Sequence, residues 1–308
     1  TATLRSSGGY FNMWLVPTNK NMGNLSVWRF FSNSAKATVQ PDYEEYGQLG
    51  YGFNIRCRVK DRSTLPNAKP IPMFEGEGTA ASPFLIKSAA DMARLAGLCS
   101  GTLTSSDTTI DFKTAHYAVA NDIDMSNVAI RPITPFSGTF DGGNYTISNV
   151  VVSPKGGTPS GLFGETENAT IKNLTIATCK INVTSKTQLY TGGIAGYAKN
   201  STIDNCALSG TIVSAATTQL TSDSESCEDG AVVGGIVGFA KNTTISNTTF
   251  KGSVDASAGQ FAGGITAVSE GGKIEKCKVD KGSRIYCSQN HAGGITALAA
   301  FDVNITEC

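Results

Sequence analysis

Three aspartates come closest to a catalytic or metal-binding arrangement. Asp122 and Asp124 flank Ile123, so in an extended strand both carboxylates would lie on one outer face. Clustered carboxylate oxygens suit Ca²⁺, and paired carboxylates also catalyse glycoside hydrolysis. Asp141 opens an Asp-Gly-Gly-Asn sequence, which the Asx-type hydrogen bonding of a turn explains. We interpret Asp122 and Asp124 as solvated outward residues, with Ca²⁺ binding as the alternative, and Asp141 as a structural turn residue. Catalysis by outward carboxylates remains a further alternative.

The other candidates for chemistry have no partner in the sequence. The two histidines, His116 and His291, stand beside no acidic or histidine motif, and we interpret both as turn residues. The chain has no His-Glu-x-x-His zinc motif, no Gly-x-Ser-x-Gly elbow and no phosphate-binding loop. We therefore expect a protein that is not an enzyme and that uses no cofactor and no metal.

Three of the eight cysteines occupy one repeated position. Cys206, Cys277 and Cys308 follow a repeat isoleucine by three residues, a position that elsewhere holds Val150, Leu174 and Thr248. A position that accepts such residues is typical of a core, where Cys acts as a small hydrophobe. We interpret the three as free buried thiols, with a Cys277–Cys308 disulfide as the alternative. No zinc-ligand spacing links the other five: Cys57, Cys99, Cys179, Cys227 and Cys287.

Aromatic residues are concentrated near the N-terminus, where exposed rings could stack on sugar rings. Tyr10 and Trp14 are the candidate ligand-binding residues of this segment. Trp28, between hydrophobic neighbours, is interpreted as core. The alternative for Tyr10 and Trp14 is that they too fill the core of a short domain.

The amino-acid composition indicates which kind of secondary structure positions these residues. Charged residues are 16% of the 308, against about 25% in average globular chains, and the 34 glycines favour a turn-rich β protein. The formal net charge of zero provides no basic field, so nucleic acid is not an expected partner. No apolar run is long enough for a transmembrane segment, and the first residues hold no apolar leader.

The C-terminal part repeats about every thirty residues, which indicates stacked supersecondary units. Each repeat combines a glycine-rich start, such as Gly192–Gly196 or Gly234–Gly238, with alternating strands and an asparagine. The asparagines predict a ladder of bends at Asn149, Asn173, Asn205 and Asn247. Because Lys276 and Glu307 replace asparagine, the last coils should be less regular. The pattern predicts an all-β fold, a parallel β-helix or solenoid of about six or seven coils.

Three segments follow from these patterns. Residues 1–63 form a small β-rich domain with short strands at 12–16, 25–31 and 52–59, residues 64–74 a proline-rich linker, and residues 75–308 the solenoid. Residues 88–99 predict a helix that begins with a capping Ser88, and this helix would cover the first coil. A polar loop is expected between Ala215 and Asp229.

Two family resemblances add to this interpretation. Residues 76–308 resemble the GLUG-motif repeat proteins of bacterial surfaces, with similar segments at 76–96, 117–126 and 136–147 and the defining tetrapeptide at Gly161-Leu-Phe-Gly164. Residues 1–60 resemble part of the Fibrobacter-type major paralogous domain, a lectin-like fold, at 4–8, 27–30 and 51–61. The first resemblance implies export to the cell surface and an adhesin-like or scaffold role without a reaction.

The resulting expectation is a secreted or surface-exposed bacterial protein for cell adhesion or scaffolding. Its partners would be glycans, host proteins or matrix proteins. One alternative is a carbohydrate-active lyase or glycosidase built on the solenoid. Another is an assembly subunit that self-associates through the solenoid end, because the chain stops within a repeat at Cys308.

Overall fold

The computed structural model describes residues 2–6, 9–13, 73–105, 107–153, 157–185, 189–216, 231–257, 259–288 and 290–308. The chain divides into two compact units, Thr1–Lys69 and Pro70–Cys308, and each is described by itself. In the first unit, β1 (Ala2–Ser6) and β2 (Gly9–Met13) pair antiparallel as a hairpin. The strands expected at 25–31 and 52–59, and the expected loop from residue 217 to Asp229, lie outside the described residues. The three-segment scheme stays a prediction.

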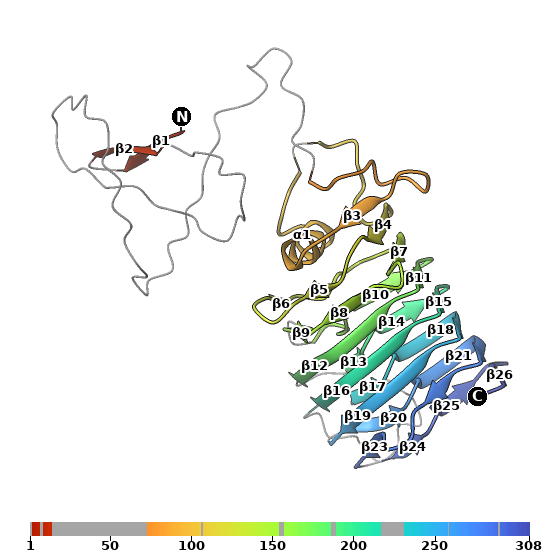
Figure 1. Ribbon diagram of the computed structural model, residues 1–308. Helices are drawn as coiled ribbons and strands as arrows, with labels where there is room; N and C mark the ends of the chain where they lie inside the picture. Colours follow the sequence, from red (N-terminus) through yellow and green to blue (C-terminus); the bar gives the residue numbers. More distant parts are fainter. Residues whose placement is uncertain are drawn as a thin grey trace. The chain divides into compact units, whose positions relative to one another are not determined.

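The second unit begins with a short strand, β3 (Phe84–Ile86), and the expected helix, α1 (Ala89–Cys99). Ser88 caps the helix, since its Oγ accepts the Asp91 amide at 3.2 Å and donates to the Asp91 carboxylate at 2.8 Å. Met92 and Leu95 are fully buried on one face of the helix. Figure 1 shows α1 at the β3 end of the stacked strands, where the sequence places a cap.

The remaining strands stack in three parallel sheets (Figure 1). The first sheet adds to β3 the strands β4 (His116–Val119), β7 (Thr139–Asp141), β10 (Phe163–Glu167), β11 (Thr170–Lys172), β14 (Ala195–Lys199), β15 (Thr202–Asp204), β18 (Val237–Ser246), β21 (Thr266–Glu275), β25 (Thr296–Ala300) and β26 (Asn304–Thr306). The second holds β5 (Ile123–Asp124), β6 (Ala129–Ile130), β8 (Thr146–Ser148), β9 (Val151–Val152), β12 (Thr175–Ser185), β16 (Ala207–Ala216), β19 (Thr249–Ala256), β22 (Lys278–Val279) and β23 (Arg284–Cys287). The third holds β13 (Leu189–Gly192), β17 (Ala231–Gly234), β20 (Gly259–Gly263) and β24 (His291–Gly293).

Stacked residues of successive coils build one continuous core. In the first sheet Ile171, Ile203, Ile245 and Ile274 pair in register, and each is fully buried. Burying a side chain of this size stabilises the fold by about 1.5–3 kcal/mol relative to leaving it exposed. The predicted fold class, a mostly β parallel solenoid with one helix, is confirmed.

Left-handed residues turn the chain from the first sheet into the second. Asn173, Asn205 and Asn247 have φ of 52°, 49° and 50°. Asparagine accepts this region more readily than most residues. Lys276 and Glu307 keep the same bend, with φ of 51° and 54°, and the Lys276 amide still reaches the Thr306 carbonyl at 3.0 Å. The expected irregularity at these two positions was wrong, because the backbone bonds of neighbouring coils impose the bend.

Asn149 does not belong to this ladder. Its amide bonds to the carbonyl of Ala177 at 2.9 Å, and the preceding strand β8 pairs Ile147 with Ile176 of the second sheet. The bend that stacks on Asn173 is formed instead by the turn around Gly143, where the Asn144 amide reaches the Asn173 carbonyl at 3.2 Å. Val150 therefore also lies outside the repeated cysteine position. The early coils are shorter, so alignment by the isoleucine misplaced the register there.

A second bend, which the sequence analysis missed, divides the first sheet into two rows. Asn168, Asn200 and Asn242 have φ of 55°, 48° and 47°. The next coil makes the same bend with Gly271–Gly272, and the coil after it bends over one residue more, with Phe301 and Asp302 left-handed. The signal was present in the two clearest repeat copies, which both read Lys-Asn-Ser/Thr-Thr-Ile.

The glycine-rich motif forms a turn that points into the core. Ile194, Ile236 and Ile265 at its tip are fully buried. A Cβ on Gly234 would lie 1.8 Å from the carbonyl oxygen of Val237, so the two legs of the turn approach closer than any side chain permits. A Cβ on Gly264 would lie 2.1 Å from the Gly294 carbonyl oxygen and 2.5 Å from Val279 of the second sheet. Glycine at these positions lets the turn point into the core and pack closely against the turn of the neighbouring coil.

The same motif position offers a matched test of this close approach. We expect Gly264→Ala to lower the free energy of unfolding by about 1–3 kcal/mol, because the added methyl overpacks a filled space. A Cβ on Gly294, the equivalent glycine one coil later, would meet no atom within 4 Å, so Gly294→Ala should be nearly neutral. Urea unfolding followed by circular dichroism measures both. Equal effects would contradict the packing role.

Candidate functional site

The outward aspartates are held by structural hydrogen bonds. Asp122 accepts the Thr146 amide at 2.8 Å. Asp124 accepts the Ser126 amide at 2.9 Å and the Asn149 side-chain amide at 2.9 Å. The hydrogen bonds from Asn149 and Ser126 lower the pKa of Asp124. A general acid needs a raised pKa, so Asp124 is suited to a structural role rather than to proton donation.

Asp141 is also held by structural hydrogen bonds and has a lowered pKa. It accepts the Gly143 amide at 2.9 Å and the Asn173 side-chain amide at 3.0 Å, and Lys172 lies 3.3 Å away. Partial burial raises the pKa of Asp141, but the bonds from Asn173, Gly143 and Lys172 outweigh it and the pKa is lowered. Asp141 therefore connects one coil to the next.

The two histidines, interpreted from the sequence as turn residues, each begin a strand instead. His116 begins β4, and His291 begins β24 with its ring stacked 5.8 Å from Phe261. Within the described ranges, no group of three His, Cys, Asp or Glu side chains is arranged to hold a metal ion. Tyr10 lies in β2, but its side chain is outside the described residues, and so is the whole of Trp14.

At the repeated position the cysteines and Thr248 donate a hydrogen bond to the backbone, whereas Leu174 fills the position without a donor. Cys206 Sγ donates to the Asp204 carbonyl at 3.2 Å, and Cys277 Sγ donates to the Glu275 carbonyl at 3.3 Å. Thr248 makes the matching bond to Ser246 at 2.7 Å. Burial raises the pKa of Cys206 to about 12 and that of Cys277 to about 11. All three thiols are free, but Cys308 is exposed, so the expectation that it is buried was wrong.

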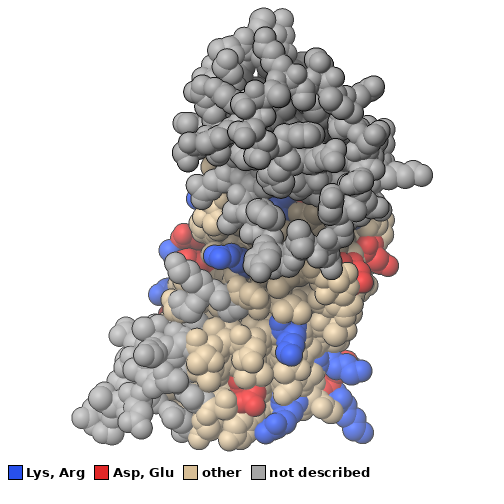
Figure 2. All heavy atoms as spheres, turned by 90° about the vertical axis from the view of Figure 1, so that its left-hand side faces the viewer, with Lys and Arg blue, Asp and Glu red and all other residues tan. Residues whose placement is uncertain are grey.

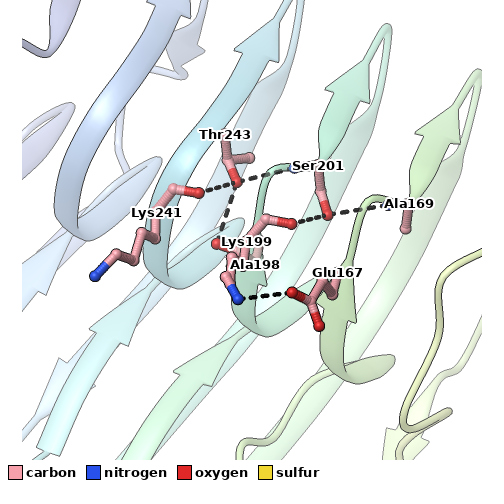
Figure 3. A network of polar contacts seen from close by, with 7 residues as sticks. All are labelled: Glu167, Ala169, Ala198, Lys199, Ser201, Lys241 and Thr243. Carbon is pink, nitrogen blue, oxygen red and sulfur yellow. Dashed lines mark hydrogen bonds and ion pairs between the residues drawn. The ribbon is translucent and has the colours of Figure 1, made fainter.

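Buried hydroxyls link coils at the second bend (Figure 3). Thr243 Oγ1 donates to the carbonyls of Ala198 and Lys241 at 3.1 and 3.0 Å and accepts the Ser201 amide at 3.3 Å. Ser201 Oγ in turn accepts the Ala169 amide at 3.2 Å. The amides of Ala169 and Ser201 each follow a left-handed asparagine, which turns them away from the regular strand hydrogen bonds. Each hydroxyl supplies one of these amides with an acceptor.

Charged residues follow the outer edge of the same bend. Glu167, Lys199, Lys241 and Glu270 pair in register along four successive coils. Lys199 Nζ lies 2.6 Å from Glu167, and Lys241 Nζ lies 3.4 Å from Glu270. Figure 3 shows Lys241 pointing away from the Lys199–Glu167 pair. The column therefore contains two separate ion pairs.

A hollow of about 230 Å³ adjoins the second of these pairs and is the candidate site. Lys241, Asn242, Glu270 and Phe301 line it. Phe301 is 77% exposed, and it is the most exposed of the large hydrophobic side chains in the part of the chain that the structure describes. The sequence analysis did not select it, because an aromatic residue near a repeat end resembles a core position.

Three aromatic rings, Tyr190, Tyr197 and Phe239, pack against one another. Tyr190 lies 5.7 Å from Tyr197 and 5.0 Å from Phe239, in a corner between the third and first sheets. Phe239 and Phe261 there are 6% and 7% exposed. These rings fill a second small apolar cluster, which stabilises the corner and leaves no open ring face at Phe239 or Phe261.

Charge is distributed without a dominant sign on the visible surface. Figure 2 shows Lys and Arg scattered with Asp and Glu over one face, separated by broad neutral areas of the described residues. Such a face provides no long positive track for a nucleic-acid backbone. Among the described residues, no helix has the length and apolar character needed to cross a membrane.

Comparisons with known proteins agree with this architecture. A family model described as the GLUG motif matches residues 187–213, the stretch around β13, the inner turn and β16. Halomucin of Haloquadratum walsbyi is 33% identical over 119 residues, which is 35% of this chain and 1% of that protein. This chain thus spans about 1% of the length of the curated relative it matches.

A solved structure shares the fold. The crystal structure of a Bacteroides ovatus protein, provisionally assigned as an immunoglobulin A1 protease, aligns with a TM-score of 0.55 at 22% identity. The alignment covers 76% of this chain and 67% of that one. At this identity the likeness concerns the fold alone. The GLUG resemblance is confirmed as a motif within a β-solenoid, whereas the comparisons bring no support for a Fibrobacter-type domain in residues 1–60.

The role of the Thr243 hydroxyl at the second bend can be tested by a near-isosteric substitution. We expect Thr243→Val to lower the free energy of unfolding by about 1–3 kcal/mol, because the buried Ser201 amide loses its acceptor. Thr244→Val, on the half-buried outer face next to it, should change stability by less than about 0.5 kcal/mol. Thermal unfolding of both variants and of Thr243→Ser is the measurement. A neutral Thr243→Val would contradict the coil-bridging role.

The thiols predict a selective labelling pattern. Below pH 9 the folded chain should protect Cys206 and Cys277 from iodoacetamide, because their pKa values lie above the ordinary value of 9.0. As pH rises from 9 toward 11 or 12, these thiols should destabilise the fold, since the unfolded chain ionises first. Exposed Cys308 should react at pH 8. Peptide mass spectrometry reads each site, and a Cys277–Cys308 disulfide would instead leave both unlabelled in denaturant until a reductant is added.

Proposed function

We propose that this chain works at the outside of a cell as a rigid, non-catalytic rod of adhesin or scaffold type. The GLUG match and the likeness to halomucin support a surface protein of this kind. The proposed partners are glycans, host proteins or matrix proteins, bound by side chains that the coils present at fixed spacings. Scattered charge and zero net charge favour such partners over nucleic acid.

One observation carries the proposal: the aspartates that were candidates for catalysis form hydrogen bonds that hold neighbouring coils together. Asp124 and Asp141 accept two or more hydrogen bonds and have lowered pKa values. Asp204 has the same character, with bonds from Ser246 and Asn247 that lower its pKa. None of the three aspartates has the raised pKa that the general acid of a glycosidase needs, and their hydrogen bonds between coils support a structural role.

The test combines binding with turnover. The purified chain, applied to glycan and matrix-protein arrays, should bind a selective set of targets while releasing no reducing ends or unsaturated products from the same polysaccharides. Trp14→Ala and Tyr10→Ala, compared with the unchanged chain, would show whether the first unit carries the binding. Turnover abolished by Asp122→Asn or Asp124→Asn would contradict the non-catalytic role and favour the enzyme.

Location needs a separate measurement, because a binding protein can work in several compartments. Antibody raised against the purified chain should label intact cells of the source organism, and external protease should remove that label. A protected antigen that appears only after lysis would contradict the surface role. This outcome is independent of which ligand the chain binds.

A further inference from the structure

The first strand of the solenoid, β3, is covered on its outer edge by a short segment of the chain. β3 stands at the end of the first sheet and pairs with β4 on one side. On its other side the Leu85 amide donates to the Glu75 carbonyl at 2.8 Å, in an antiparallel bridge. Lys87, directly after β3, adds an ion pair with Glu75. Residues 73–75, here called the strap, therefore take the place of one further strand.

The central side chain of the strap closes the end of the core. Phe74 is 4% exposed, and its ring lies 5.4 Å from that of Phe84, 5.7 Å from Tyr117 and 6.3 Å from Phe112. Detachment of the strap would expose this aromatic cluster together with the Leu85 amide. An unpaired strand edge beside an apolar surface is the kind of surface to which another strand adds.

One helical residue holds the strap from the side. Arg94 Nη1 donates to the Met73 carbonyl at 3.0 Å, and the Arg94 guanidinium lies 5.6 Å from the centre of the Phe74 ring. The guanidinium also pairs with Asp91 of α1, which keeps it pointing along the helix toward the strap. Arg94 is partly exposed, whereas Met92 and Leu95 form the buried face of α1. This contact can therefore be removed without opening the core under the helix.

We propose that the strap is a releasable seal over a strand-pairing surface whose partner is a second copy of this chain. When the strap detaches, β3 pairs antiparallel with β3 of the second copy around Leu85. This pairing brings Phe84 of each copy opposite Ile86 of the other, and both side chains already belong to the core. An isolated peptide would gain only the three residues of β3, whereas a second copy also covers the aromatic cluster with its own.

The closed strap thus keeps the chain monomeric at this end. The inference goes beyond the proposed function, because it holds whichever ligand the chain binds. A glycan array or a surface label can therefore fail while the strap stands, and the reverse is equally possible.

Hydrogen exchange at two neighbouring amides measures whether the strap opens. The Leu85 amide faces the strap, whereas Ile86 faces β4, since its carbonyl accepts the Ala120 amide at 3.0 Å. In dilute solution Arg94→Ala should speed exchange at Leu85 at least about tenfold and leave Ile86 within about twofold. Protection of Leu85 should return at high concentration, where the second copy replaces the strap. An unchanged rate at Leu85 in the dilute variant would overturn the role of Arg94.

Sedimentation velocity over a range of concentrations tests the docking surface. The unchanged chain should stay monomeric, and Arg94→Ala should form a reversible dimer. Leu85→Pro added to Arg94→Ala should restore the monomer, because proline lacks the donor that the second copy needs and is tolerated on an edge strand. Arg284→Ala, which removes an exposed arginine from β23, should sediment as the unchanged chain does.

The double variant separates specific pairing from aggregation of a weakened fold. Aggregation would affect both variants alike, and circular dichroism checks that each keeps its β-sheet signal. Arg94→Met keeps the aliphatic length of the side chain and should dimerise as Arg94→Ala does, so a folding defect in one variant leaves the other to decide. A monomeric Arg94→Ala whose Leu85 amide exchanges fast, or equal association of the double variant, would overturn the proposal.

Discussion

The solenoid depends on bends that recur at the same place in every coil. Parallel strands share hydrogen bonds only when their residues stay in register, so one misplaced bend would displace every amide after it. Asparagine accepts the left-handed conformation of the bend, and its side chain also bonds to the next coil, as Asn205 does to Asn173 at 2.8 Å. Lys276 and Glu307 take the same conformation without this preference. The stack therefore imposes a geometry that the local residue does not favour.

The inner glycine turn solves the complementary problem of filling the interior. Two sheets bent around a wide coil would leave a gap that side chains alone fill poorly. The chain instead folds inward, and Ile194, Ile236 and Ile265 occupy the space at the tip of the turn. Close contact between the legs excludes any Cβ at positions such as Gly234. The motif that identifies the repeat in sequence is thus the part of each coil that lies deepest.

The period, the core isoleucines and the capping helix could be predicted because each follows from local pattern. The register of the early coils could not, since Asn149 and Ile147 match the repeat in sequence and yet pair with the second sheet. The cysteine position was predicted as buried, but the hydrogen bond from Cys206 Sγ to the Asp204 carbonyl could not be predicted from the sequence. Phe301 was missed because an aromatic residue near a repeat end resembles a core position, and Tyr10 and Trp14 stay predictions.

The charged column beside the second bend also has a mechanical consequence. Lys199 and Lys241 stand opposite each other on neighbouring coils, while each bonds to an acidic partner on its other side. Like charges in this arrangement repel, so the surface weakens the junction that Thr243 clamps from within. Added salt would screen the repulsion between the lysines together with both Lys–Glu attractions, but it would leave the hydrogen bonds of the buried Thr243 hydroxyl in place. Under tension, cohesion at this junction therefore depends on that hydroxyl rather than on the surface charges.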